Sequence, residues 1–136
     1  MEQIQFDSGM VSYRVNGKGV LRFNPADPNL YARFMQLGEK ISQMEAQLND
    51  IQDPAVQFQQ ADAGIKELLS WVFGRHNDFD ALLGGVSLLA VATNGNRVLD
   101  NLLQALEPIL ASGVRQYAQE LTSNAVAAAK QRRDRC

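Results

Sequence analysis

The sequence has very few of the residues on which disulfide, metal and acid–base chemistry depend. Its 136 residues include one cysteine, Cys136, and one histidine, His76. A single cysteine excludes an internal disulfide, and one histidine with one cysteine is too small a set for the usual structural zinc site. We therefore expect no metal and no other cofactor in this protein.

Long apolar runs and a strong excess of positive charge are also absent. The most apolar stretch, residues 81–92, is interrupted by two glycines and a serine, and it is shorter than the about 20 residues that span a bilayer. The first residues lack the basic start and apolar block of a secretory signal. With 13 basic and 15 acidic residues, the chain has no broad cationic surface for nucleic acid. We expect a soluble, cytoplasmic protein that neither spans a membrane nor binds nucleic acid as its main activity.

What the sequence does contain is the composition of an ordinary folded domain. It is 46% hydrophobic and 21% charged, and its length suits one hydrophobic core. We expect one domain over residues 1–129 and a basic tail over residues 130–136. Residues 27–80 hold nine acids and four bases, a net charge of -5, whereas the tail holds four bases and one acid, a net charge of +3. The tail is compatible with a solvated helix end and with a contact to an acidic partner or nucleic acid.

Residues 10–24 have the pattern of a β-hairpin. Apolar residues occupy every second position on both sides of the turn sequence Asn16-Gly17-Lys18-Gly19. Asn-Gly readily adopts the positive φ angles that tight hairpin turns need. Because an isolated hairpin is only marginally stable, its apolar face is expected to pack on helices or to pair with another chain. Ile4 and Phe6 are candidates for a third short strand.

Two helices are predicted next, and each begins with the same dipeptide. Asp27-Pro28 and Asp53-Pro54 both supply a good N-cap followed by a proline that fits the first helical position. Apolar residues then recur every three or four positions, which predicts helices over about 28–49 and 54–74. A short connection between them favours an antiparallel helical hairpin.

The remaining chain predicts a short helix and one long helix. Residues 79–83 are expected to form one or two helical turns. The apolar stretch 86–93 is expected to be buried, and its pattern is compatible with a helix or a strand. Asn96 is a candidate N-cap for a last helix over about 97–129, in which Pro108 is expected to cause a kink. The fold class is therefore mainly α (α+β), with an N-terminal β-hairpin, a helical hairpin and a long C-terminal helix.

Residues with catalytic potential are few, and each has a simpler explanation. His76 lies near Asp78 and Asp80, as an Asp-oriented general base would, but a solvated linker histidine is the interpretation that we favour. Cys136 follows basic residues that favour a thiolate, yet a terminal residue is not held in one place. Helix capping explains Asp53, and the acidic pairs lack the other ligands of a calcium loop. We expect no enzymatic activity.

A set of short motifs does resemble a known family. It comprises the hairpin, the helix entry Asp27-Pro28-Asn29, the helix exit Val72-Phe73-Gly74, the pairs Gly84-Gly85 and Asn94-Gly95, and a final helix through residues 102–110. In this order, over residues 10–120, they resemble the small tail assembly chaperone-like proteins of tailed phages and prophages of Gram-positive bacteria. The resemblance implies a helical, non-catalytic protein that binds the tape measure protein before the tail tube forms and is absent from the finished virion. In some of these phages a longer, frameshifted product also exists.

For such a role we hypothesise an apolar client surface around the end of the second helix and the segment after it. Its proposed residues are Trp71, Phe73, Leu82, Leu83, Leu88 and Leu89. Recognition of a helix in an apolar groove needs such a surface, although packing in the core explains the same residues. The alternative function is a structural tail completion or connector subunit, a homo-oligomer that assembles through the edge of its hairpin.

Overall fold

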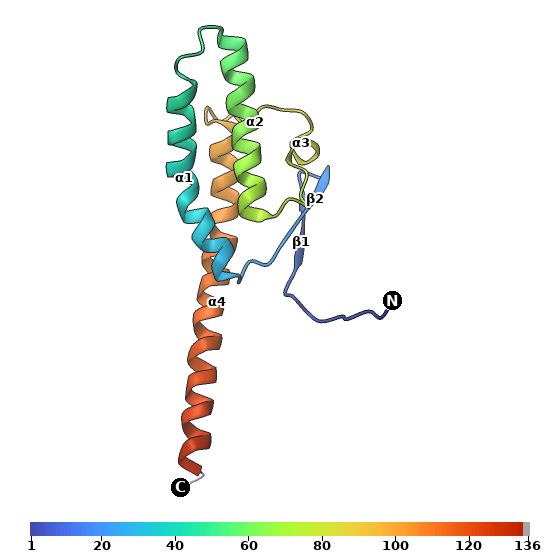
Figure 1. Ribbon diagram of the computed structural model, residues 1–136, viewed down its shortest axis with the longest axis vertical. Coiled ribbons are helices and arrows are strands. Elements are labelled where there is room, and N and C mark those ends of the chain that lie inside the picture. The colour runs from blue at the N-terminus through green and yellow to red at the C-terminus, as the bar shows by residue number, and fades with distance from the viewer. Residues whose placement is uncertain (135–136) are drawn as a thin grey trace.

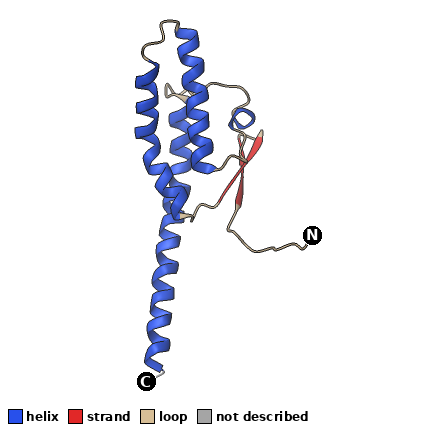
Figure 2. Ribbon diagram, in the orientation of Figure 1, coloured by secondary structure: helices blue, strands red, loops and turns tan. Residues whose placement is uncertain are grey.

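The computed structural model describes residues 1–134 and confirms the mainly α fold with an N-terminal hairpin and a long C-terminal helix (Figure 1; Figure 2). Its elements, in chain order, are β1 (Val11–Val15), β2 (Gly19–Phe23), α1 (Pro28–Leu48), α2 (Pro54–Phe73), α3 (Phe79–Leu82) and α4 (Val98–Asp134). Cys136, considered above as a nucleophile, lies outside the described residues.

The hairpin forms at the predicted place. β1 and β2 are antiparallel, with Tyr13 opposite Leu21, and the turn between them uses positive φ at Asn16 and Gly17. Leu21 and Phe23 are each 1% exposed, because one face of the sheet packs on the helices. The expectation that the apolar face of the hairpin needs a partner is met within the chain.

The third strand considered for Ile4 and Phe6 does not form. Residues 1–10 contain no helix or strand, and the two side chains are 89% and 80% exposed. A carboxylate oxygen of Asp7 accepts a hydrogen bond from the amide of Gly9 at 2.8 Å, and the Asn24 side chain donates to the carbonyl of Ser8 at 3.0 Å. These contacts hold the chain in a course that leads away from the hairpin (Figure 1).

The two Asp-Pro pairs begin α1 and α2 as predicted. Asp27 accepts a hydrogen bond from the amide of Asn29 at 2.9 Å, and Asp53 accepts one from the amide of Ala55 at 3.0 Å. The helices run antiparallel, side by side (Figure 1), and make the most extensive contact between helices in the molecule. α2 ends at Gly74, whose φ of 112° is easily adopted only by glycine.

Phe73 lies at the centre of the core. Its ring is 5.0 Å from that of Phe23 in β2, 6.4 Å from that of Phe34 in α1 and 6.2 Å from that of Phe79 in α3. Aliphatic side chains from the sheet and every helix complete the buried cluster, which includes Leu21, Leu30, Leu37, Ile65, Leu69, Val72, Leu82, Leu88, Leu99, Leu106 and Leu110.

The segment between α3 and α4 is neither the helix nor the strand that its apolar pattern was compatible with. Residues 83–97 form turns with one isolated β-bridge, between Val91 and Arg97. Leu88 is buried, but Val86 and Val91 are 42% and 73% exposed, so the predicted burial of the whole stretch is wrong. The glycines at 84 and 85, with φ of 61° and 81°, break the chain direction before a helix or strand can begin.

This segment, and not Asn96, caps α4. The amides of Val98 and Leu99 donate to the carbonyls of Ala90 and Leu88 at 2.8 and 2.9 Å. Asn96 instead donates from its side chain to Asn101 at 3.3 Å. Backbone carbonyls therefore satisfy the first amides of the helix, a task that side-chain oxygens perform in α1 and α2.

α4 continues past residue 129 to Asp134, so the described part of the basic tail is helical. Pro108 has no amide hydrogen to donate to the carbonyl of Gln104. Both residues are exposed, so this carbonyl is near solvent, and the helix continues through Pro108. At Gly113 the helix passes directly against the Pro25 carbonyl in the β2–α1 connection. Beyond this point α4 projects from the body (Figure 1), and we call residues 114–134 the C-terminal arm.

Candidate binding surfaces

The C-terminal arm carries an apolar stripe that is half-buried at Val114 and exposed from Tyr117 onward. Val114, Tyr117 and Leu121 follow Leu110 at intervals of four, three and four, so they continue the face by which α4 packs in the body. Leu110 is 1% exposed, whereas Tyr117 is 38% and Leu121 53% exposed. The stripe is thus the unburied extension of a core-forming face.

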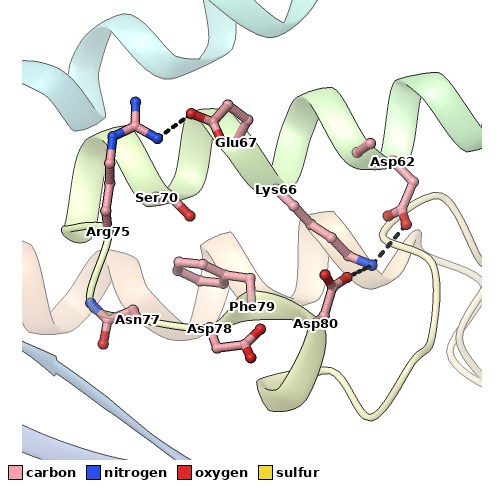
Figure 3. A pocket seen from close by; sticks show the side chains of 10 residues that line it. Asp62, Lys66, Glu67, Ser70, Arg75, Asn77, Asp78, Phe79 and Asp80 are labelled. Carbon is pink, nitrogen blue, oxygen red and sulfur yellow. Dashed lines mark hydrogen bonds and ion pairs between the residues drawn. The ribbon is translucent and has the colours of Figure 1, made fainter.

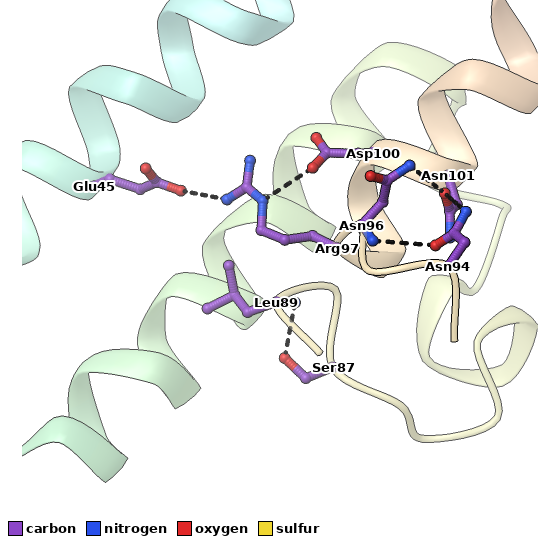
Figure 4. Close-up of polar contacts among 8 residues, drawn as sticks. All are labelled: Glu45, Ser87, Leu89, Asn94, Asn96, Arg97, Asp100 and Asn101. Carbon is purple, nitrogen blue, oxygen red and sulfur yellow. Dashed lines mark hydrogen bonds and ion pairs between the residues drawn. The ribbon is translucent and has the colours of Figure 1, made fainter. Parts of the chain in front are cut away.

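A second apolar surface is a groove near the tip of the α1–α2 hairpin. It measures about 350 Å³ and is lined by Glu45, Leu48, Asn49, Gln57, Phe58, Ala61, Leu89 and Arg97. Phe58 is 58% exposed, and Leu48 and Leu89 are half-buried. At its rim Arg97 lies 3.7 Å from the carboxylate of Glu45 and donates to Asp100 at 3.3 Å (Figure 4). This tip groove joins α1, α2 and the start of α4.

The client surface hypothesised from the sequence divides into buried and half-buried residues. Phe73, Leu82 and Leu88 are 2%, 4% and 0% exposed and belong to the core. In this conformation their side chains offer nothing for a partner to contact, because the sheet, α3 and the helices already cover them. The rest of the set, Trp71, Leu83 and Leu89, is half-buried.

The half-buried members do not form one surface by themselves. Lys40 of α1 places its ammonium 4.9 Å from the centre of the Trp71 ring, a cation–π contact between α1 and α2. Leu89 lines the tip groove. The structure therefore brings one of the six predicted residues to a groove that a partner can enter.

A polar cleft of about 480 Å³ lies between α2 and α3 (Figure 3). Lys66 occupies one end, 2.8 Å from a carboxylate oxygen of both Asp62 and Asp80. Asp62 also accepts the amide of Leu88 at 2.8 Å. At the other end Arg75 pairs with Glu67. Both cations of this cleft are paired with carboxylates, and Asp78, which also lines it, caps α3. These contacts tie α2 to α3 and to the segment that caps α4.

Lys66 is held as a cation. Its side chain is 13% exposed, and burial opposes its charge, but the hydrogen bonds and negative charges of Asp62 and Asp80 prevail and raise the pKa of Lys66 above its ordinary value. A lysine that acts as a nucleophile or general base needs the opposite shift. Lys66 is therefore suited to an ion pair and unsuited to either of those two roles.

His76 is not oriented by an aspartate. Its Nε2 donates to the carbonyl of Arg22 at 2.8 Å, and its side chain is otherwise exposed. Asp78 instead caps α3 by accepting the amide of Ala81 at 3.2 Å, and Asp80 pairs with Lys66. The Asp-oriented general base considered from the sequence is not assembled.

The neighbouring Asn77 is a buried polar residue that sequence reasoning missed. At 4% exposure, its side chain accepts the Arg22 amide at 2.8 Å and donates to the Arg22 and Phe73 carbonyls at 2.9 and 3.1 Å. The amide group thus imitates a neighbouring strand at the outer edge of β2 and links that edge to the end of α2. A lone asparagine in a polar linker gives no sequence signal for this contact.

Comparisons of the chain with protein-family models, with curated protein sequences and with solved structures give no match. The surfaces described above, together with the motifs of the sequence, are therefore the basis for a functional proposal.

Within residues 1–134, no helix has the length and hydropathy to cross a membrane. The same part of the chain contains no group of three or more histidine, cysteine or acidic side chains arranged to hold a metal ion.

Proposed function

We propose that this protein is a non-enzymatic tail assembly chaperone of a phage or prophage, which binds the tape measure protein in the bacterial cytoplasm during tail morphogenesis. The observation that carries the proposal is the exposed apolar stripe of the C-terminal arm. The motif order of the sequence, which resembles such chaperones, supplies the identity of the client.

The arm has the physical properties of a helix that works by pairing. A helix without tertiary contacts is marginally stable in water, and this one extends the core-packing face of α4 with Val114, Tyr117 and Leu121. Full burial of a large apolar side chain contributes about 1.5–3 kcal/mol, and a partner that covers the exposed parts of Tyr117 and Leu121 gains a fraction of this from each. A long amphipathic helix of a client, laid along this stripe, is the partner that such a surface fits best.

The tip groove supports the same kind of binding. Its apolar lining by Leu48, Phe58 and Leu89 suits an aliphatic or aromatic side chain, and its polar rim suits a peptide at the surface. Both surfaces hold protein segments and neither assembles reactive groups, in keeping with a chaperone.

Co-expression with the tape measure protein of the same phage or prophage, followed by pull-down, tests the proposal. The double substitution Tyr117→Asp with Leu121→Asp is expected to reduce the captured client by about tenfold or more. Each aspartate removes an apolar contact and adds a charge whose burial against the client carries a desolvation penalty. Solubility of the client in the co-expressing cells provides the second readout.

The matched control is Gln119→Asp with Ser123→Asp. These residues are exposed and lie on the opposite side of the arm from Tyr117 and Leu121. The control variant therefore adds the same negative charge as the stripe variant, but away from the stripe. The control is expected to capture the client as the wild type does. No complex with the wild type, and no gain in client solubility, would falsify the proposal.

The second candidate is a structural subunit of the tail, and the unpaired edge of β1 favours it. A subunit that assembles through this edge remains in the finished particle, whereas a chaperone leaves. Detection of the protein in purified virions by mass spectrometry supports the structural role, and its absence from virions supports the chaperone.

A further inference from the structure

The hairpin has one closed edge and one open edge. Each residue of an antiparallel strand directs both of its backbone groups to one side, and those of Arg22 are bonded to Asn77. Its partner across the hairpin is Ser12, and the next equivalent pair is Val20 with Arg14. The backbone groups of Ser12 and Arg14 must therefore point to the outer edge of β1, where no hydrogen bond to them is made within residues 1–134.

A segment of the same chain has the pattern that this edge needs. Within residues 2–7, Glu-Gln-Ile-Gln-Phe-Asp, polar and apolar side chains alternate from Gln3 to Asp7, as in a strand with one buried face, and Glu2 lies at the end of the face of Ile4 and Phe6. Ile4 and Phe6 lie on one face of such a strand and are 89% and 80% exposed. The chain thus has two large apolar side chains with no cover and, separately, a sheet with an unpaired edge.

The space into which these side chains would point is a partly apolar cleft. A cleft of about 400 Å³ lies between β1 and α4 and is lined by Tyr13, Pro25, Pro108, Ile109, Ser112, Gly113 and Gln116. Tyr13 belongs to the inward face of β1, the face of Leu21 opposite it. In a strand added at this edge, side chains on the Tyr13 face would lie beside Tyr13, which shares this cleft with α4.

The charges agree with this pairing. Any register that places Ile4 and Phe6 on the Tyr13 face places Asp7 on the opposite face of the sheet, with Arg14 and Arg22. Of the two acids in residues 1–10, Asp7 therefore lies on this basic face, whereas Glu2 lies on the other face near the strand end. Opposite charges across strands, such as Asp7 beside these arginines, stabilise the pairing.

We propose that residues 2–7 of one copy of the protein add to the open edge of β1 in a second copy, as a third strand whose Ile4 and Phe6 enter the cleft beside Tyr13. The chain's own segment is held in another direction by the contacts of Asp7 with Gly9 and of Asn24 with Ser8. A second copy meets no such obstacle. This self-association does not depend on the client, and it specifies the contact through which the structural-subunit candidate would assemble.

Sedimentation or light-scattering mass measurements on the full chain, over a range of concentrations, test the proposal. The wild type is expected to rise from the 15.0 kDa of one copy to at least twice that mass. The variant Ile4→Asp with Phe6→Asp is expected to weaken association by more than about tenfold. Its circular dichroism and melting temperature should match those of the wild type, because both side chains are exposed outside the core.

A complementation experiment separates the segment from the edge. Ser12→Pro removes the outward amide of β1 and leaves its bonds to β2 intact, which edge strands tolerate. This variant keeps the segment but loses the edge, whereas the Ile4/Phe6 variant keeps the edge but loses the segment. Each alone is expected to remain at 15.0 kDa, and an equal mixture is expected to form a species of twice that mass.

The matched control is Met35→Asp with Val86→Asp, which changes two other exposed apolar residues by the same charge and is expected to associate as the wild type does. A wild type that stays monomeric at every concentration overturns the proposal. So does association that persists in the Ile4/Phe6 variant, or that is lost instead through Tyr117→Asp with Leu121→Asp, which would place the interface on the C-terminal arm.

Discussion

Gly113 of α4 packs directly against the backbone carbonyl of Pro25, so closely that a Cβ atom at this position would overlap with it. Pro25 lies in the connection between the hairpin and α1. The absence of a side chain at Gly113 therefore sets how near α4 approaches the rest of the body, and it marks the residue at which α4 leaves the body and the C-terminal arm begins.

The substitution Gly113→Ala is expected to destabilise the protein by about 1–3 kcal/mol, because the overlap is with backbone and α4 must shift to relieve it. Urea unfolding followed by circular dichroism measures the change. Gly38→Ala is the control, since Gly38 is in the interior of α1 and nothing lies within 4 Å of the added Cβ. There alanine is expected to stabilise the helix by about 0.5–1 kcal/mol. Equal effects of the two substitutions would contradict the close contact at Gly113.

Asn77→Ala is expected to cost about 1–3 kcal/mol of unfolding free energy, because it leaves the amide of Arg22 and the carbonyl of Phe73 without their partner, whereas the carbonyl of Arg22 keeps its hydrogen bond from His76. Urea unfolding measures the loss. Amide hydrogen exchange at Arg22 gives a local readout, and exchange there is expected to accelerate more than at Leu21, whose amide faces β1. Unchanged exchange at Arg22 would show that Asn77 does not close the β2 edge.

Local chemistry made part of this fold predictable. The caps of α1 and α2 depend on Asp27 and Asp53, each within two residues of the amide that it accepts, and the hairpin turn depends on Asn16-Gly17. The cap of α4 was not predictable, because its acceptors are backbone carbonyls of residues 88 and 90, which any sequence possesses. Whether they reach the helix depends on tertiary packing.

The boundary between core and surface was harder still to predict. The apolar stripe of α4 stays on one face of the helix from Leu99 through Leu110 to Leu121. Periodicity alone therefore does not indicate where the other elements stop covering that face. The body ends where the β2–α1 connection crosses α4 at Gly113, a property of the packed structure. An apolar pattern also does not distinguish a binding surface from the core. Phe73 and Leu88, which the sequence suggests for a client surface, lie in the centre of the core.

Lys66 is expected to stabilise the fold in a pH-dependent way. Because its pKa is raised in the folded state, its contribution is fully present below its ordinary pKa of 10.5 and is lost as the pH rises through the folded-state value. Lys66→Met is therefore expected to be less stable than the wild type at pH 8, and the difference should shrink in more alkaline solution. Unfolding free energies of both proteins across this range provide the measurement. A difference that stays constant above pH 10.5 would exclude the ion pairs with Asp62 and Asp80 as its cause.

Removal of the arm after Tyr117 is expected to leave the body folded. Every residue named in the buried core lies at or before Leu110, and the side chains described beyond Tyr117 are exposed. A chain ending at residue 117 should therefore keep its melting temperature within a few degrees, roughly the effect of one kcal/mol in a domain of this size. Its helical signal in circular dichroism should fall because α4 is shorter. Loss of cooperative unfolding in the truncated chain would contradict this and make the arm part of the folding unit. If the body does persist, the arm is free to serve as a binding helix, and capture of the client by the truncated chain should fall as it does for the stripe variant.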